Sequence, residues 1–127
     1  MLVLQWKKFR KLTEARKAFA KEPCIYVQTN AKGEIFRVGA ATEGLSVRYR
    51  GGTGYALDAA MHGSQNLVFA AAVPKEVCRA VEAILIYEEK PSYNNQGKRN
   101  PPSTSMQLAH FGDAPAFGTS ARDHAAN

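Results

Sequence analysis

The stretch CIYVQTNAKGEIFRVG, residues 24–39, decides the fold of this chain. Its two ends, residues 24–29 and 34–39, are rich in β-branched and aromatic residues, which favour strands. The four residues between them, NAKG, begin with Asn and end with Gly, and both residue types tolerate the positive φ of a hairpin turn. The stretch therefore predicts an antiparallel β-hairpin.

Further elements are predicted downstream of the hairpin. Residues 45–50 indicate one or two turns of helix, and the apolar residues 66–73 indicate a buried third strand. Pro74 suits the first turn of a helix, where its missing N–H has no partner to lose. We expect this helix to continue through residues 75–89 and to stop before Pro91.

The length of 127 residues fits one compact domain with a small core. Within residues 5–20, apolar residues recur at helical spacing between bases: Trp6, Phe9, Leu12 and Phe19. Residues 1–22 are therefore expected to form a basic amphipathic helical arm, and residues 23–99 the folded domain. Residues 100–127 contain few large apolar groups and much Ala, Ser, Gly and Pro, which predicts a disordered tail.

The positive charge is concentrated at the N-terminal end. The chain has 17 Lys and Arg against 11 Asp and Glu, a formal net charge of +6. Residues 1–22 contain seven bases and two acids and so carry +5 of that total. This distribution favours an anionic partner, and the N-terminal arm is the segment expected to contact it.

The sequence also argues against several classes of protein. No apolar run reaches the roughly 18–20 residues that span a bilayer, so no membrane partner is expected. The first apolar residues precede the basic cluster, which is the reverse of a secretory signal, and we expect a cytoplasmic protein. Two cysteines, Cys24 and Cys78, are too few for a disulfide scaffold and are interpreted as reduced core residues.

A carboxylate interrupts the apolar stripe of the predicted long helix. Cys78, Glu82 and Ile86 lie four residues apart and therefore share one side of the helix, the side expected to face the core. Two interpretations remain open: a glutamate that serves a site, or a flanking glutamate that either pairs with Arg79 three residues earlier or stays solvated at the edge of the stripe. Periodicity alone favours the second, because surface ion pairs are common.

Short segments in order along the chain resemble one nuclease family: CIY at 24–26, RVG at 37–39, LSVR at 45–48, EAILI at 82–86 and PSYN at 91–94. The first two, ten residues apart, resemble the paired motif that names the GIY-YIG nucleases. The others are similar to that family's arginine helix, glutamate helix and closing Tyr-Asn. The resemblance covers about residues 23–98 and implies an α/β (α+β) fold with a small three-stranded antiparallel sheet flanked by helices. This agrees with the elements predicted from the residues themselves.

The resemblance implies a metal-dependent endonuclease that hydrolyses nucleic-acid phosphodiesters with one divalent metal, Mg²⁺ or Mn²⁺. DNA is favoured over RNA as the substrate. Carried over by position, Glu82 would hold the metal and Arg48 would contact the scissile phosphate. Tyr26 would line the site near the nucleophilic water, and Asn94 would fix the local loop.

These assignments are physically reasonable. Mg²⁺ is commonly bound through only one or two carboxylates, with water completing its shell, so Glu82 alone can anchor it. Arg48 offers a permanently charged, planar donor that binds a phosphate through two hydrogen bonds. A phosphodiester gains negative charge in the transition state, and both groups stabilise that charge.

Two positions depart from the family pattern. Cys24 stands where the first motif has glycine, which a strand with room for a small side chain tolerates. Arg37 stands where the second motif usually has tyrosine. Either Tyr26 takes the place of that tyrosine, with Arg37 as a residue that assists it or adds a phosphate contact, or the chain is a catalytically inactive nucleic-acid-binding module that retains the nuclease fold.

Several residues outside these motifs are expected to contact nucleic acid: Lys7, Lys8, Arg10, Lys11, Arg50 and Lys98. His62 is a possible active-site residue, because some homing-endonuclease relatives place a histidine nearby; an exposed loop histidine is the simpler interpretation. Sequence-specific members of the family commonly carry a separate recognition domain, and none is visible here. We therefore expect a protein partner to supply specificity, or a substrate recognised by its structure. The oligomeric state is left open.

Overall fold

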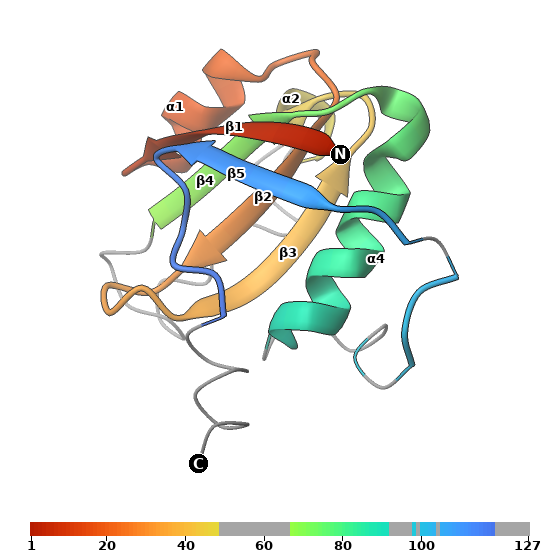
Figure 1. The fold of residues 1–127 in the computed structure, drawn as a ribbon. Coiled ribbons are helices and arrows are strands. Elements are labelled where there is room, and N and C mark those ends of the chain that lie inside the picture. The colour runs from red at the N-terminus through yellow and green to blue at the C-terminus, as the bar shows by residue number, and fades with distance from the viewer. Residues whose placement is uncertain (49–66, 92–97, 99, 104, 119–127) are drawn as a thin grey trace.

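The computed structural model describes residues 1–48, 67–91, 98, 100–103 and 105–118. Within these ranges the strands form one five-stranded sheet: β1 Leu2–Phe9, β2 Cys24–Thr29, β3 Ile35–Ala41, β4 Leu67–Ala72 and β5 Leu108–Gly112. Their order is β3-β2-β4-β1-β5 (Figure 1). The pairing of β1 with β5 is parallel, and the other neighbouring strands are antiparallel.

Helices cover both faces of this sheet: α1 Leu12–Ala18, α2 Leu45–Arg48, a 3₁₀ turn Lys75–Val77 and α4 Cys78–Glu89. Figure 1 shows α1 and α2 together and away from α4, which crosses β3 and β2. Alternate strand residues therefore enter two cores. Ile25 and Val38 pack with α4, whereas Cys24 and Tyr26 pack with Ala15 and other residues near α1 and α2. No helix among the described residues is long and apolar enough to cross a membrane.

The hairpin prediction is confirmed. Strands β2 and β3 pair antiparallel, with Tyr26 opposite Gly39. The connecting residues form the turn that their chemistry favours, because Asn30 Oδ1 accepts hydrogen bonds from the N–H groups of Lys32 and Glu34, both at 3.0 Å. Gly33 has a φ of +87°, which suits glycine.

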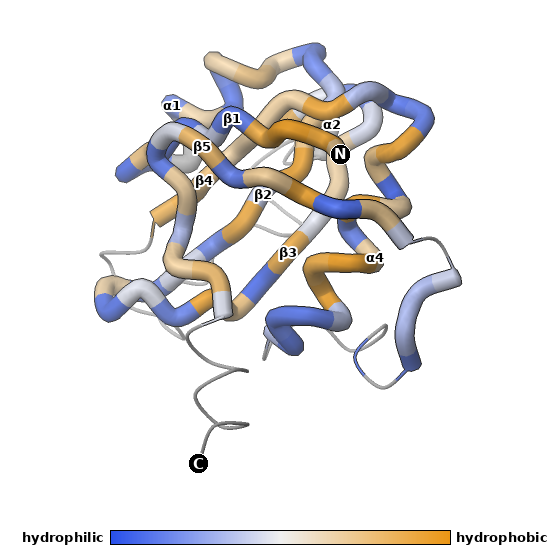
Figure 2. Tube along the Cα trace, viewed as in Figure 1, coloured by the Kyte–Doolittle hydropathy of each residue, from blue (hydrophilic) through white to orange (hydrophobic). Residues whose placement is uncertain are grey.

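The predicted third strand and long helix are also confirmed. Strand β4 occupies residues 67–72, and α4 follows the 3₁₀ turn that begins after Pro74. The helix ends at Glu89, because Lys90 adopts a left-handed conformation with φ 48° just before Pro91. Figure 2 shows the apolar residues of α4 in orange.

The predicted N-terminal helix over residues 5–20 is wrong in its first half, where β1 occupies Leu2–Phe9. Trp6 and Phe9 have helical spacing but lie in different cores on opposite faces of the sheet. The spacing of two residues over so short a segment does not distinguish a helix from a strand. The segment is a strand because it pairs with β4 and β5. Only residues 12–18 form the helix α1.

The prediction of a disordered tail over residues 100–127 is wrong for its central part, since residues 108–112 form β5. Few apolar residues are needed there, because the strand gains its backbone hydrogen bonds from β1 and buries only one side. Strands β1 and β5 also correct the predicted sheet of three strands to one of five.

Candidate active site

The second motif ends in a glycine because a tyrosine ring occupies the space of its side chain. Tyr26 on β2 lies opposite Gly39 on β3. A Cβ atom built on Gly39 would overlap the Tyr26 phenol, with Cε1 of the ring only 2.7 Å away. Tyr26 is fully buried in this arrangement. The first tyrosine and the second glycine of the paired motif are therefore one packing unit.

Glu82 is fixed to the same point of the sheet. Its Oε2 accepts a hydrogen bond from the backbone N–H of Ala40 at 2.9 Å. Strand β3 is an edge strand, so this N–H points away from β2 and is available to a side chain. Helix α4 thus carries its carboxylate to the residue that follows Gly39, and the Glu82 side chain remains 18% exposed.

The expected pairing of Glu82 with Arg79 is also present. The Arg79 guanidinium lies 3.5 Å from Glu82 Oε1, and the Arg79 side chain is 66% exposed. An exposed pair of this kind contributes little to stability. The pairing with Arg79 is therefore confirmed: one oxygen of Glu82 is anchored on β3, and the other faces this cation at the surface.

The helix that ends in Arg48 is anchored to the end of α1. The N–H groups of Leu45 and Ser46 donate to the carbonyls of Phe19 and Ala20, at 2.8 and 3.3 Å. Gly44 has a φ of +94°, and a Cβ there would meet the Ala20 backbone. Only glycine permits this close approach. Helix α2 thereby receives a fixed position; the side chain of Arg48 lies outside the described part of the structure.

Solved structures of a bacterial nuclease domain have the same arrangement of elements. The GIY-YIG N-terminal endonuclease domain of UvrC from Thermotoga maritima, a tyrosine-to-phenylalanine mutant bound to its catalytic divalent cation, matches with a TM-score of 0.53 and 24% identity. The match covers 69% of this chain and 99% of that chain. The chain has the GIY-YIG endonuclease fold. The same domain bound to magnesium matches at 23% identity and a TM-score of 0.52, over 68% of this chain and 99% of that one.

No protein-family model and no curated protein matches the chain. The recognition of the GIY-YIG fold from the sequence is nevertheless confirmed by these structures. The identity is too low to transfer the role of any residue. The contacts of Tyr26, Gly39 and Glu82 are therefore the basis for assigning a site within this fold.

Arg37 departs from the GIY-YIG pattern in a buried position. It is 7% exposed and lies opposite Gln28 on the hairpin. It is a diagonal cross-strand neighbour of Tyr26, a separation of about 7–8 Å that long side chains bridge. Tyr26 and Arg37 therefore lie on the same face of the sheet, and Arg37 is a neighbour of the packed pair Tyr26 and Gly39.

The structure brings some of the predicted site residues together and leaves others undescribed. Tyr26 and Arg37 are brought together on the side of the hairpin that faces α1 and α2, whereas Glu82 reaches the edge of β3 from the α4 side. Arg50, His62 and Asn94 lie outside the described residues. The sequence did not indicate the Ala40 N–H as the partner of Glu82, because a backbone donor has no signature in the side chains.

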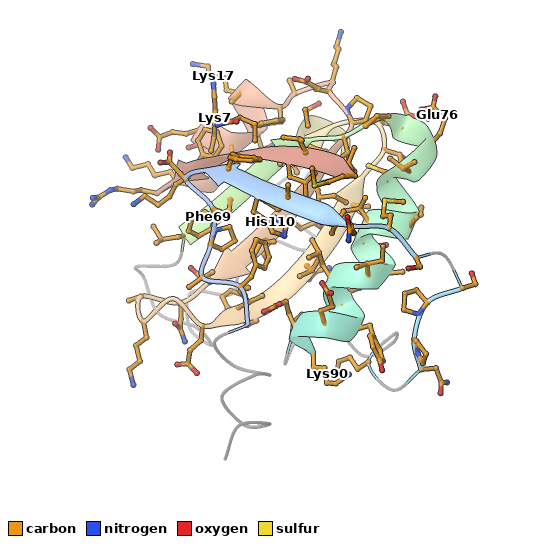
Figure 3. All side chains as sticks on the ribbon, viewed as in Figure 1. Lys7, Lys17, Phe69, Glu76, Lys90 and His110 are labelled. Carbon is orange, nitrogen blue, oxygen red and sulfur yellow. The ribbon has the colours of Figure 1, made fainter. Side chains whose placement is uncertain are left out.

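The predicted nucleic-acid contacts lie mostly on β1 and the start of α1. Lys7, Lys8, Arg10 and Lys11 are exposed. Figure 3 shows Lys7 and Lys17 at the same end of the molecule, so α1 adds to this basic surface. Lys98 is different, because its ammonium donates to the carbonyl of Pro91 at 3.0 Å and closes the turn after α4.

Both cysteines are free and buried, as expected for core residues. Cys78 Sγ donates to the carbonyl of Cys24 at 3.5 Å. Burial raises the pKa of the Cys24 thiol to about 12, and the pKa of Cys78 is raised for the same reason. The thiols therefore stay protonated and do not supply a nucleophile.

The donor set around Glu82 suits a hard divalent cation bound mainly by water. Among the described residues, no three His, Cys, Asp or Glu side chains gather as a metal site. Glu82 offers one carboxylate that is oriented by Ala40 and partly open to solvent. Mg²⁺ accepts such a site, because it retains several of its waters and needs only one or two carboxylates.

Proposed function

We propose that this protein is a metal-dependent endonuclease that hydrolyses phosphodiester bonds of nucleic acid, with DNA as its substrate. The observation that supports this most strongly is the anchoring of the Glu82 carboxylate by the Ala40 N–H at the edge of the sheet, in a chain with a nuclease fold. The carboxylate comes to this edge from the α4 side, whereas Tyr26 fills the space beside Gly39 on the α1 and α2 side.

Each residue has a distinct role in the proposed reaction. Glu82 holds Mg²⁺ or Mn²⁺, which when bound supplies charge stabilisation to the phosphoryl oxygen and the leaving alkoxide. Arg48 holds the scissile phosphate through two hydrogen bonds. Tyr26 packs on Gly39 and keeps this part of β3 in place, and Asn94 orders the loop after α4.

The basic surface of β1 and α1 is proposed to hold the phosphate backbone. Lys7, Lys8, Arg10 and Lys11 are all exposed, so phosphates can reach them. Contacts of this type carry little sequence information and weaken steeply as salt rises. We therefore propose that specificity comes from the shape of the substrate or from a protein partner. The two free, buried thiols support the proposed cytoplasmic location.

The proposal predicts cleavage that depends on a divalent metal. Supercoiled plasmid, single-stranded DNA and a branched duplex are incubated with the protein in Mg²⁺, Mn²⁺ or EDTA. We expect cutting of at least one substrate with either metal and none in EDTA. Without a bound cation, the Glu82 carboxylate cannot stabilise the negative charge that develops on the phosphoryl group. Absence of cutting by a folded protein at high concentration, with either metal, contradicts the proposal.

A second candidate function is a nucleic-acid-binding module that has lost catalysis. The observation in its favour is Arg37, which replaces the tyrosine of the second motif inside the buried site. Such a module binds DNA equally well with Mg²⁺ or EDTA, and Glu82→Ala leaves its affinity unchanged. An endonuclease instead requires both the metal and the carboxylate for turnover.

Replacing Arg37 tests whether it has taken over a catalytic role. We expect Arg37→Ala to lower kcat about 10²-fold, the usual effect of removing one preorganised donor. Arg37→Lys, which retains the charge but not the planar fork, is expected to lie between wild type and the alanine variant. Because Arg37 is buried, thermal unfolding of each variant is measured as a control for stability. Unchanged cleavage by a folded Arg37→Ala protein excludes the role.

A further inference from the structure

One part of the sheet is left uncovered by the helices that the structure describes. We call it the β1–β5 face; it consists of Val3, Gln5, Lys7, Ala109 and Phe111. These residues share one side, because Leu4 and Trp6 alternate into the core on the other side. The parallel register places Val3 beside Ala109 and Gln5 beside Phe111. The five side chains therefore form one continuous surface across two strands.

The β1–β5 face carries two large apolar side chains that are exposed. Phe111 is 53% exposed and Val3 is 52% exposed. Helix α1 covers the same side of the sheet only at the far end of β1, where Phe9 packs against Phe19 with ring centroids 6.1 Å apart. Phe111 lies on β5, the strand at the edge of the sheet, and its exposed ring is available to a planar ligand.

The contacts of His110 with the core keep its neighbour Phe111 on the exposed side of β5. The neighbouring residue His110 points inward, where its Nδ1 accepts a hydrogen bond from Trp6 Nε1 at 3.0 Å. Its ring also stacks on Phe117, with centroids 4.2 Å apart. Burial lowers the pKa of His110, so Nδ1 remains an acceptor at neutral pH. Strand β5 cannot rotate Phe111 inward without breaking these contacts.

Cations flank the β1–β5 face on one side. Lys7 belongs to the face itself, and the segment that follows β1 together with α1 adds the exposed bases Arg10, Lys11 and Lys17, whereas Lys8 alternates to the opposite side of β1. The nearby acids are Glu14 of α1 and Asp113, whose N–H bonds to the Trp6 carbonyl. The surface is thus an exposed aromatic ring with a strong excess of positive charge on one side.

We propose that the β1–β5 face binds an unpaired segment of nucleic acid, with a base stacked on Phe111 and the adjoining phosphates held by Lys7 and the neighbouring bases. Stacking on an exposed aromatic ring combined with a basic flank is the general basis of single-strand binding. In a duplex the faces of the bases are already occupied by their neighbours. The surface therefore prefers substrates with unpaired bases, such as single strands, flaps or branches. This inference extends the proposed function, but it concerns binding and does not require that the chain cleaves.

Fluorescence anisotropy with a labelled oligothymidylate tests the proposal, in EDTA so that no cleavage intervenes. We expect Phe111→Ala to weaken this binding about tenfold, the effect of losing one stacked base, and to change the affinity for a duplex of the same length by less than about twofold. Phe111→Tyr retains the ring and should bind like wild type. Phe111→Leu retains apolar area without the ring and should bind like the alanine variant.

An oligonucleotide of the same length with abasic sites provides the second control. The difference between wild type and Phe111→Ala should disappear on it, since only phosphate contacts remain. The proposal is overturned if Phe111→Ala binds oligothymidylate like wild type, or if its affinity for the duplex falls equally. It is also overturned if light scattering shows that the substitution converts a dimer to a monomer, because the face then joins two copies of the chain. If the protein never cuts DNA but Phe111→Ala still weakens the binding of oligothymidylate, the proposed nuclease activity is rejected and the proposed binding surface is retained.

Discussion

Replacing Glu82 with glutamine should reduce metal-dependent cleavage at least about 10³-fold, because it removes the negative charge that holds the divalent cation. The fold should survive this change. The amide oxygen of glutamine can still accept the hydrogen bond that Ala40 N–H donates to Oε2 at 2.9 Å. The loss of the pair with Arg79 has little effect on stability, because Arg79 is largely exposed. Initial rates of plasmid nicking across a series of Mg²⁺ concentrations measure the effect.

Glu88→Gln is the matched control for this experiment. Glu88 lies on the same helix and is exposed, so its replacement changes the net charge by the same amount without touching β3. We expect this variant to cleave like wild type. Equal rates for wild type and Glu82→Gln, with both proteins folded, would show that the carboxylate does not hold the metal.

Gly39→Ala should lower the free energy of unfolding by about 2–3 kcal/mol, which is the usual cost of forcing extra volume into a packed core. The cause is contact rather than backbone strain. Gly39 is not among the glycines with positive φ, but its Cβ would overlap the Tyr26 phenol. Urea denaturation followed by circular dichroism measures the change. Cleavage should fall as well, because the displaced ring adjoins the strand that anchors Glu82.

A double-mutant cycle separates this contact from other effects of the added methyl group. In a Tyr26→Leu background the ring is absent, so Gly39→Ala should cost less than about 1 kcal/mol. The difference between the two costs is the coupling energy of Tyr26 and Gly39. Equal costs in both backgrounds would show that the tyrosine is not the reason for glycine at this position.

The central part of the fold could be predicted because its signals are local. The hairpin has strand-forming residues on both sides of a turn that Asn30 and Gly33 specify. Helix α4 has a helical period and is bounded by Pro74 and Pro91. Each of these features is visible within one short continuous segment of the sequence. The placement of Glu82 on the side of α4 that faces the sheet followed from the same period.

The outer strands could not be predicted because their partners are distant. Trp6 and His110 are hydrogen-bonded across 104 residues, and neither sequence segment alone indicates the other. Few apolar residues mark β5, and the spacing of Trp6 and Phe9 imitates a helix. The anchor of Glu82 was missed for a related reason: a free backbone N–H on β3 appears only once the strand order makes β3 an edge.

The parallel pairing of β1 with β5 affects the order in which a newly made chain completes its fold. During synthesis β1 leaves the ribosome first, and β4 is the earliest partner available to it. Its other edge must wait until residues 108–112 have emerged. Until then, an unpaired strand edge with Leu2 and Val3 is open to other nascent chains. A ribosome stalled before β5 would therefore hold an intermediate with four strands and an exposed edge, and chaperones that recognise extended apolar segments would find it there.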